Sequence, residues 1–258
     1  MRNTRSIGTR LLIAAGALVV AWGATQVATQ KNEAVPDADT LATALVPSTS
    51  AAAVPTSTPP PLPPGFPSMD RHPPKIEVPE GEPQPIATKF GLTYDIPADW
   101  ENFDGGVAGW SGNSEIITYG APGFYGVDAC PEAGDANWRA MTGVSARRGM
   151  DLTTAAADEA GKIERSLADA EAPDMRFQHS APVETEINGR PALRTTITVT
   201  GLPQEAACEP PKVTYDVVAT PALATANVML LVIQNSRDVP DAADQATVEE
   251  IINTLRPS

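Results

Sequence analysis

The sequence contains few of the residues that build metal and catalytic sites. Among its 258 residues there are two histidines and two cysteines, and only 5% are aromatic. A structural zinc site takes about four ligands, and His179 is the only histidine after residue 72. The sequence also contains neither a glycine-rich phosphate loop nor an H-E-x-x-H motif. We therefore expect no catalytic residue, no cofactor and no metal.

Basic residues are also scarce. The chain has 18 Lys and Arg against 32 Asp and Glu, and its net charge is -14. Nucleic-acid binding depends on neutralising phosphates with basic side chains, so we expect no nucleic-acid partner. Peripheral binding to anionic lipid is disfavoured for the same reason.

The N-terminal residues 1–30 have the pattern of an export signal. Arg2, Arg5 and Arg10 precede an apolar run from Leu11 to about Ala28, and the segment contains no acid. Arginines before the apolar run place the rest of the chain outside the cytoplasm. We predict a signal-anchor helix in the cell membrane that spans it once. The alternative is a secreted protein, cleaved near Gly23 after the small residues Ala21 and Gly23.

Residues 31–88 are rich in Pro, Ala, Thr and Ser and contain few large apolar side chains. Such a composition predicts a disordered spacer with polyproline II character. We expect the folded domain to occupy residues 89–258.

The two cysteines, Cys130 and Cys208, both lie in this domain. In an oxidising compartment a lone pair of cysteines in one domain most often forms a disulfide. A metal site and two free thiols are the alternatives.

Hydrophobic periodicity predicts seven strands and two helices. Asn188-Gly189 between two alternating runs predicts a tight hairpin. One helix is expected from Leu152 to Leu167 behind Asp151, and a second around Ala246 to Leu255 behind Asp241. The expected strands are Phe90–Ile96, Glu115–Tyr119, Trp138–Ala146, Val183–Ile187, Ala192–Thr200, Val213–Thr220 and Asn227–Gln234. This order predicts an α+β domain with a mostly antiparallel sheet of about six to seven strands, covered by the two helices.

Several of these segments resemble a known family. The strand ending in Ile96-Pro97-Ala98-Asp99-Trp100, the central helix, the N-G-R-P-A hairpin and the C-terminal helix resemble the PsbP-like (Mog-type) α/β/α sandwich. In particular the chain is similar to actinobacterial envelope proteins that include the LpqN-type lipoproteins, although it lacks their lipidated cysteine. The resemblance implies a domain used for binding or assembly, without shared catalytic residues.

Two segments have residues that could carry chemistry. Gly109-Trp110-Ser111-Gly112-Asn113 nearly matches a nucleophile elbow, but Asn113 replaces the final glycine. A hydrolase would then use Ser111 with His179. The acids Asp95, Asp99, Glu101 and Asp104 lack the spacing of a calcium loop, so a solvated acidic loop is the favoured interpretation.

Aromatic residues concentrate between residues 100 and 138. Phe124 and Tyr125 are adjacent, and adjacent side chains point to opposite faces of a strand. Packing of both rings in the interior is the favoured interpretation. The alternative is a binding surface formed by Trp110, Phe124 and Tyr125.

Together these features predict a non-catalytic binding or assembly protein of the bacterial cell envelope, anchored in the membrane with its domain outside the cytoplasm. Its partner would be an envelope protein or lipid. The alternatives are a secreted carrier of an apolar ligand and a secreted hydrolase.

Overall fold

The computed structural model describes residues 73–258, apart from 113–114, 135–136, 169–171 and 173. The predicted signal-anchor and most of the predicted spacer therefore lie outside the described residues. Within the described part, no helix has the length and apolar character needed to cross a membrane.

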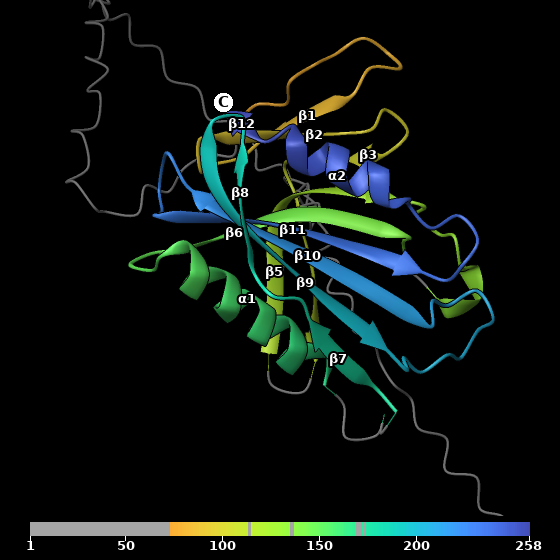
Figure 1. The fold of residues 1–258 in the computed structure, drawn as a ribbon. Helices are drawn as coiled ribbons and strands as arrows, with labels where there is room; N and C mark the ends of the chain where they lie inside the picture. Colours follow the sequence, from red (N-terminus) through yellow and green to blue (C-terminus); the bar gives the residue numbers. More distant parts are fainter. Residues whose placement is uncertain (1–72, 113–114, 135–136, 169–171, 173) are drawn as a thin grey trace, which may run out of the picture. The chain divides into compact units, whose positions relative to one another are not determined.

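A nine-stranded antiparallel sheet forms the centre of the domain (Figure 1). Its strands, in spatial order, are β3 (Glu101–Asn102), β5 (Glu115–Tyr125), β6 (Ala140–Arg147), β11 (Val228–Arg237), β10 (Lys212–Pro221), β9 (Arg190–Thr200) and β7 (Arg176–His179). In addition, β4 (Val107–Gly112) pairs with β5, and β8 (Val183–Ile187) pairs with β9.

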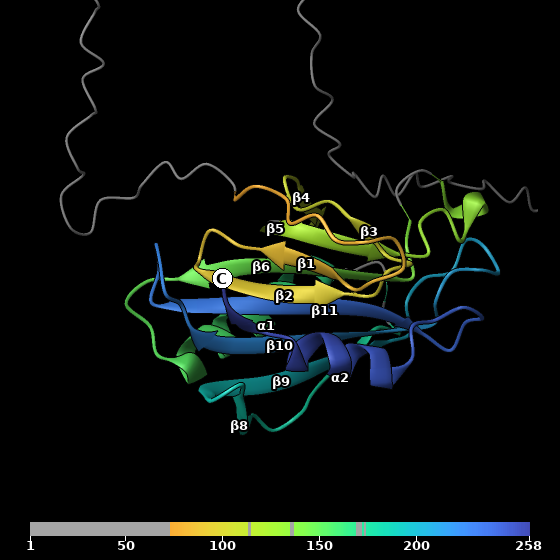
Figure 2. The ribbon, with the colours of Figure 1, turned by 90° about the horizontal axis from the view of Figure 1, so that it is seen from above.

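A second, three-stranded sheet lies over one face of the large sheet (Figure 2). Its central strand is β2 (Leu92–Ile96), which pairs with β1 (Gln84–Ala87) on one side and with β12 (Arg256–Pro257) on the other. Ile86 and Leu92 are fully buried in the core between the two sheets.

The two helices lie on opposite faces of the large sheet (Figure 1). Helix α1 (Leu152–Leu167) covers one face with Ala156, Ala160 and Ile163. Helix α2 (Gln245–Asn253) packs on the other face beside the small sheet. The predicted α+β class and mostly antiparallel sheet with two helices are confirmed.

Both helices begin at an aspartate. Asp151 caps α1 as predicted, with its Oδ1 accepting from the Thr154 N–H at 2.7 Å. The cap predicted for α2, Asp241, is wrong. Asp241 has a φ of 62°, whereas an N-cap residue normally has extended backbone. The cap is Asp244, whose Oδ1 accepts from Thr247 N–H at 2.6 Å.

The predicted hairpin is confirmed. Asn188 and Gly189 join β8 to β9 with φ values of 50° and 77°. Two positive φ values are the signature of the tight turn that Asn-Gly favours. The Asn188 side chain also donates to the carbonyls of Asn253 and Leu255, so the hairpin holds the end of α2.

The folded region begins before residue 89, where the spacer was expected to end. Strand β1 lies in the predicted spacer and pairs with β2 from Gln84 to Ala87. The sequence did not predict this strand, because it contains Pro85 and proline is disfavoured in a strand interior. It is tolerated here because β1 is an edge strand with one partner.

Strand β5 continues past its predicted end at Tyr119. Ala121 has a φ of 51°, and the pairing with β6 shifts register between Gly120 and Gly123. A bulge of this kind lets a strand accommodate proline and glycine without ending. Strands β4 and β7 were also not predicted, the first because of its two glycines and the second because it is short and largely exposed.

Candidate functional site

One face of the large sheet changes from apolar to polar along its strands. Where α2 and the small sheet cover it, the face carries Val218 and Leu231, which are fully buried. Towards the other end of the same strands, the side chains on this face are polar. We call this region the polar face; its residues are Arg176, Gln178, Thr196, Thr198, Thr200, Lys212, Thr214, Asp216, Asn235 and Arg237.

The polar face arises from simple alternation. On β9, Thr196, Thr198 and Thr200 alternate with Ile197 and Val199, which are fully buried on the α1 side. A period of two places alternate side chains on opposite faces. The strands' registers then bring the polar positions of four neighbouring strands together.

The pairing register arranges the polar face in rows. Arg176 is opposite Thr200, Thr200 is opposite Lys212, and Lys212 is opposite Arg237. This row crosses β7, β9, β10 and β11 and contains three cationic side chains. The next row consists of Gln178, Thr198, Thr214 and Asn235.

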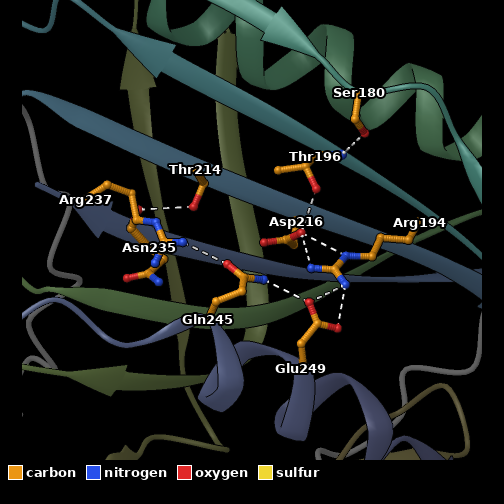
Figure 3. Close-up of polar contacts among 9 residues, drawn as sticks. All are labelled: Ser180, Arg194, Thr196, Thr214, Asp216, Asn235, Arg237, Gln245 and Glu249. Carbon is orange, nitrogen blue, oxygen red and sulfur yellow. Dashed lines mark hydrogen bonds and ion pairs between the residues drawn. The ribbon is translucent and has the colours of Figure 1, made fainter.

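An ion-pair network borders the polar face (Figure 3). Arg194 on β9 donates from Nη2 to Asp216 Oδ1 at 2.7 Å and from Nη1 to both oxygens of Glu249 at 2.7 Å. Asp216 Oδ1 also accepts from Thr196 Oγ1 at 2.7 Å. Asp216 is only 2% exposed, so Arg194 compensates the charge of a buried carboxylate. Through Glu249, the same arginine also holds α2 on the sheet.

The network changes the pKa of Arg194 and of Glu249. Partial burial acts to raise the pKa of Glu249, but hydrogen bonds from Arg194 and Gln245 outweigh it and the net pKa is lowered. For Arg194, burial acts to lower the pKa, and its contacts with Glu249 and Asp216 raise it overall. Arg194 and Glu249 therefore carry opposite charges at neutral pH.

The polar contacts continue along α2 to β11. Gln245 donates to Glu249 Oε1 at 2.9 Å and accepts from Arg237 Nη2 at 2.8 Å. Arg237 and Asn235 both donate to the Ala243 carbonyl, just before the helix. These contacts fix α2 as a wall at one side of the polar face, as Figure 3 shows.

The accessible part of the polar face lies away from α2. Arg176, Gln178 and Thr200 are exposed, whereas Thr198 and Lys212 are half-buried. These side chains offer hydroxyl, amide and cationic donors on a firm sheet. Such an arrangement can recognise a polar ligand through several hydrogen bonds at once.

A second polar network lies beneath α1. The buried carboxylate of Glu159 accepts from Tyr119 Oη at 2.7 Å, from Ser145 and from Arg147. Burial and the adjacent Glu159 charge raise the pKa of Tyr119. Because α1 covers these residues, this network holds the helix on the sheet and is closed to ligands.

The predicted disulfide forms between Cys130 and Cys208. It joins the loop between β5 and β6 to the loop between β9 and β10. Arg139 supports both loops, because its Nη1 donates to the Cys208 carbonyl at 2.9 Å and its Nη2 to the Ala129 carbonyl at 3.0 Å.

The structure divides the three aromatic residues of the possible binding surface between two cores. Tyr125 stacks on Trp100, with ring centroids 5.5 Å apart, on the side of the small sheet. Phe124 packs against Trp138 on the α1 side, with centroids 5.2 Å apart. Trp110 donates from Nε1 to Ser166 Oγ at 2.8 Å. These side chains are half-buried and do not form one surface.

Ser111 and His179 are not brought together. Strands β5, β6, β11, β10 and β9 separate their strands, β4 and β7, in the order of the sheet. Trp110 faces α1, so Ser111 projects from the opposite face. His179 faces α1 and lies 2.9 Å from a carboxylate oxygen of Glu164.

The predicted acidic loop is spread over β2 and the segment that follows it. Asp95 accepts from Arg256 at 2.8 Å, while Asp99 and Glu101 are exposed. In the described part of the chain, the one group of potential metal ligands within reach of a shared ion is Cys130, Glu132 and Cys208. Its two sulfurs are bonded to each other, so neither is available as a thiolate.

Sequence reasoning did not identify the polar face. Its signal is present in RTTITVT and in KVTYD, where polar residues occupy every second position. Alternation alone does not distinguish a solvent face from a functional one. The row of cations appears only when the register of four strands is known.

The chain was compared with curated proteins, solved structures and protein families. A search of curated proteins found no match. Among solved structures, the chain is similar to the solution structure of cyanobacterial PsbP (CyanoP) from Synechocystis sp. PCC 6803, with 11% identity and a TM-score of 0.39, over 70% of this chain and 95% of that one. It is also similar to a crystal structure from Bacteroides thetaiotaomicron VPI-5482, with 13% identity and a TM-score of 0.32. That match covers 69% of this chain and 49% of the other, so it spans about half of the Bacteroides chain.

A family model matches residues 77–258, which include every strand and helix described above. The match begins shortly before β1 and agrees with a folded region that starts before residue 89. The chain belongs to the family described as Domain of unknown function (DUF8017).

Proposed function

We propose that the protein is a non-catalytic binding protein of the bacterial cell envelope, anchored by its N-terminal segment with the domain outside the cytoplasm. The polar face beside α2 is its binding surface. The observation that carries this assignment is the row of donors across four strands, with Arg176, Thr200 and Lys212 accessible at one side.

The disulfide supports the compartment. A bond between Cys130 and Cys208 persists in an oxidising environment and is rare in the cytosol. The arginines before the apolar run at Leu11 support the same orientation. The sequence resemblance to PsbP-like (Mog-type) domains of actinobacterial envelope proteins agrees with a role in binding or assembly.

The compartment is tested by the mass of the full chain in membrane, medium and cytosolic fractions of expressing cells. We expect a full-length membrane species whose cysteines react with a thiol reagent only after reduction. A soluble species that begins near Ala24 would show that the protein is cleaved and secreted rather than anchored. Cytosolic protein with two reactive thiols would contradict the proposal.

The binding surface is tested with two exposed threonines on strands of the same sheet. Thr200→Trp places a large ring on the polar face, whereas Thr118→Trp places one on β5. The detergent-solubilised full chain is sedimented with isolated cell-wall material. We expect Thr200→Trp to abolish co-sedimentation and Thr118→Trp to retain it, and equal behaviour of the two variants would contradict the assignment.

A further inference from the structure

We propose that the polar face binds an acidic polysaccharide, with its anionic groups over Lys212 and Arg237 and its chain continuing to Arg176. This inference rests on the proposed function and names the class of ligand. It follows from the order of charges and hydroxyls in the rows of the polar face.

First, two like charges are paired on the polar face. Lys212 and Arg237 are directly opposite each other in the β10–β11 register. Like charges directly opposite on neighbouring strands destabilise a sheet. A bound carboxylate or phosphate between the two side chains would turn this repulsion into attraction.

Second, the charge of Lys212 is only weakly neutralised by carboxylates of the described residues. Asp216 and Glu249 are both occupied by Arg194. Asp238 lies 3.8 Å from Lys212, beyond hydrogen-bond distance, and its side chain is 62% exposed. A ligand anion can therefore share Lys212 without breaking a buried contact.

Third, the chain as a whole is acidic. The net charge is -14, so a general attraction for polyanions is absent. At physiological ionic strength the Debye length is about 8 Å. Repulsion from distant carboxylates is then largely screened, and the local cations decide which anions bind.

Fourth, the row of the polar face that carries the cations is long and polar. Strands in a sheet are about 4.8 Å apart, so the row from Arg176 to Arg237 spans about 14 Å. Thr200 lies between its cations, and Thr198 and Gln178 lie in the next row. Hydroxyl and amide groups between cations match a chain of sugars that carries acidic groups at intervals.

A polymer fits this face better than a bilayer. Membrane-surface segments insert large apolar side chains below the head groups. The seven exposed large hydrophobic residues of the described part, which include Phe103, Val107 and Ile116, all lie outside the polar face.

The experiment measures binding of the detergent-solubilised full chain to three probes at about 0.15 M salt. The probes are polygalacturonate as an acidic glycan, dextran as a neutral glycan, and vesicles of phosphatidylglycerol. We expect binding to polygalacturonate that weakens as salt is added, and no comparable binding to dextran or vesicles.

Charge variants identify the surface. Lys212→Gln and Arg176→Gln should each weaken polygalacturonate binding roughly two- to fivefold, the range for an exposed charge contact. The matched controls Lys162→Gln and Arg165→Gln remove the same charges from α1, on the opposite face, and should leave binding unchanged.

Each other outcome overturns the inference. Equal binding to dextran would remove the role of charge, and stronger binding to vesicles would make the ligand a lipid. Equal effects of the α1 controls would mean nonspecific attraction. If cell-wall binding remains sensitive to Thr200→Trp while polygalacturonate does not bind, the proposed function stands and the acidic ligand is wrong.

Discussion

Arg194 binds Asp216 on the neighbouring strand and Glu249 on helix α2 at the same time, with a nitrogen–oxygen distance of 2.7 Å in each pair. Arg147 holds α1 in a similar way through Asp158 and Glu159. In both helices, an arginine on a strand thus helps to hold the helix on its face of the sheet.

Arg194→Met should be strongly destabilising. It leaves the carboxylate of Asp216 buried without its cation, which typically costs about 3–5 kcal/mol. Urea denaturation measures the free energy of unfolding. The control is Arg165→Met, which removes an exposed pair with Glu115 and should cost less than about 1 kcal/mol. Equal losses for the two variants would mean that Arg194 has no special role.

Stability should fall in acid below about pH 4.5. Folding lowers the pKa of Glu249 from its usual 4.5, chiefly through Arg194 and Gln245 against an opposing effect of burial. A carboxylate with a lowered pKa stabilises the fold above its unfolded pKa, and this contribution is lost as the pH falls through the folded pKa. The melting temperature of the wild type should therefore decline in this range.

Glu249→Gln separates this contribution from general acid effects. The variant should be less stable at neutral pH and should lose less stability between neutral and acidic pH than the wild type. Glu250→Gln, an exposed change on the same helix, is matched in charge. Identical pH profiles for the two variants would show that the contact with Arg194 does not stabilise the ionised form.

Removal of the disulfide should destabilise the domain by about 4 kcal/mol. The cysteines are 78 positions apart, and closing a loop of this length restricts the unfolded chain by that amount in the chain-entropy model. The measurement is urea denaturation of the double variant Cys130→Ser, Cys208→Ser. Unchanged stability would mean that Arg139 and the surrounding hydrogen bonds hold the two loops without the covalent link.

Trp110→Ala tests whether this tryptophan is structural. The indole packs against Tyr119 and Tyr215 and donates to Ser166, so its removal should cost about 3 kcal/mol, the lower end of the range for a large aromatic residue. We expect cell-wall binding to persist under conditions in which the variant remains folded. A variant that keeps the stability of the wild type but loses cell-wall binding would show that Trp110 is part of the binding surface.

The elements that could be predicted from the sequence are those with a local cause. Asn188 and Gly189 both adopt positive φ readily and so favour a tight turn. The spacing of apolar residues from Leu152 to Leu167 depends only on the geometry of a single helix. Strand β1 could not be predicted from its local sequence. It is stabilised by pairing with β2 and by the burial of Ile86 against residues distant in the sequence. The error at Asp241 has a similar origin, since both Asp241 and Asp244 are acceptable caps and the backbone of the loop decides between them.

The polar face was beyond sequence reasoning for another reason. Each strand shows its own alternation, but the position of Lys212 opposite Arg237 depends on the register between strands. The same holds for Arg194, Asp216 and Glu249, which come from three separate elements. Pairing the two cysteines needed no register, because only two were present and both lay in one domain.

The arrangement around β2 has a consequence for the timing of folding during synthesis. Strand β2 begins at Leu92, yet one of its two partners is β12, whose last residue is Pro257. The small sheet therefore cannot be completed until Arg256 and Pro257 have left the ribosome. Helix α2, which supplies Val248 and Ile251 to the same core, also emerges late. Until then, the apolar residues of β2 lack part of their cover, and exposed apolar surface of this kind makes an incompletely folded chain prone to aggregation.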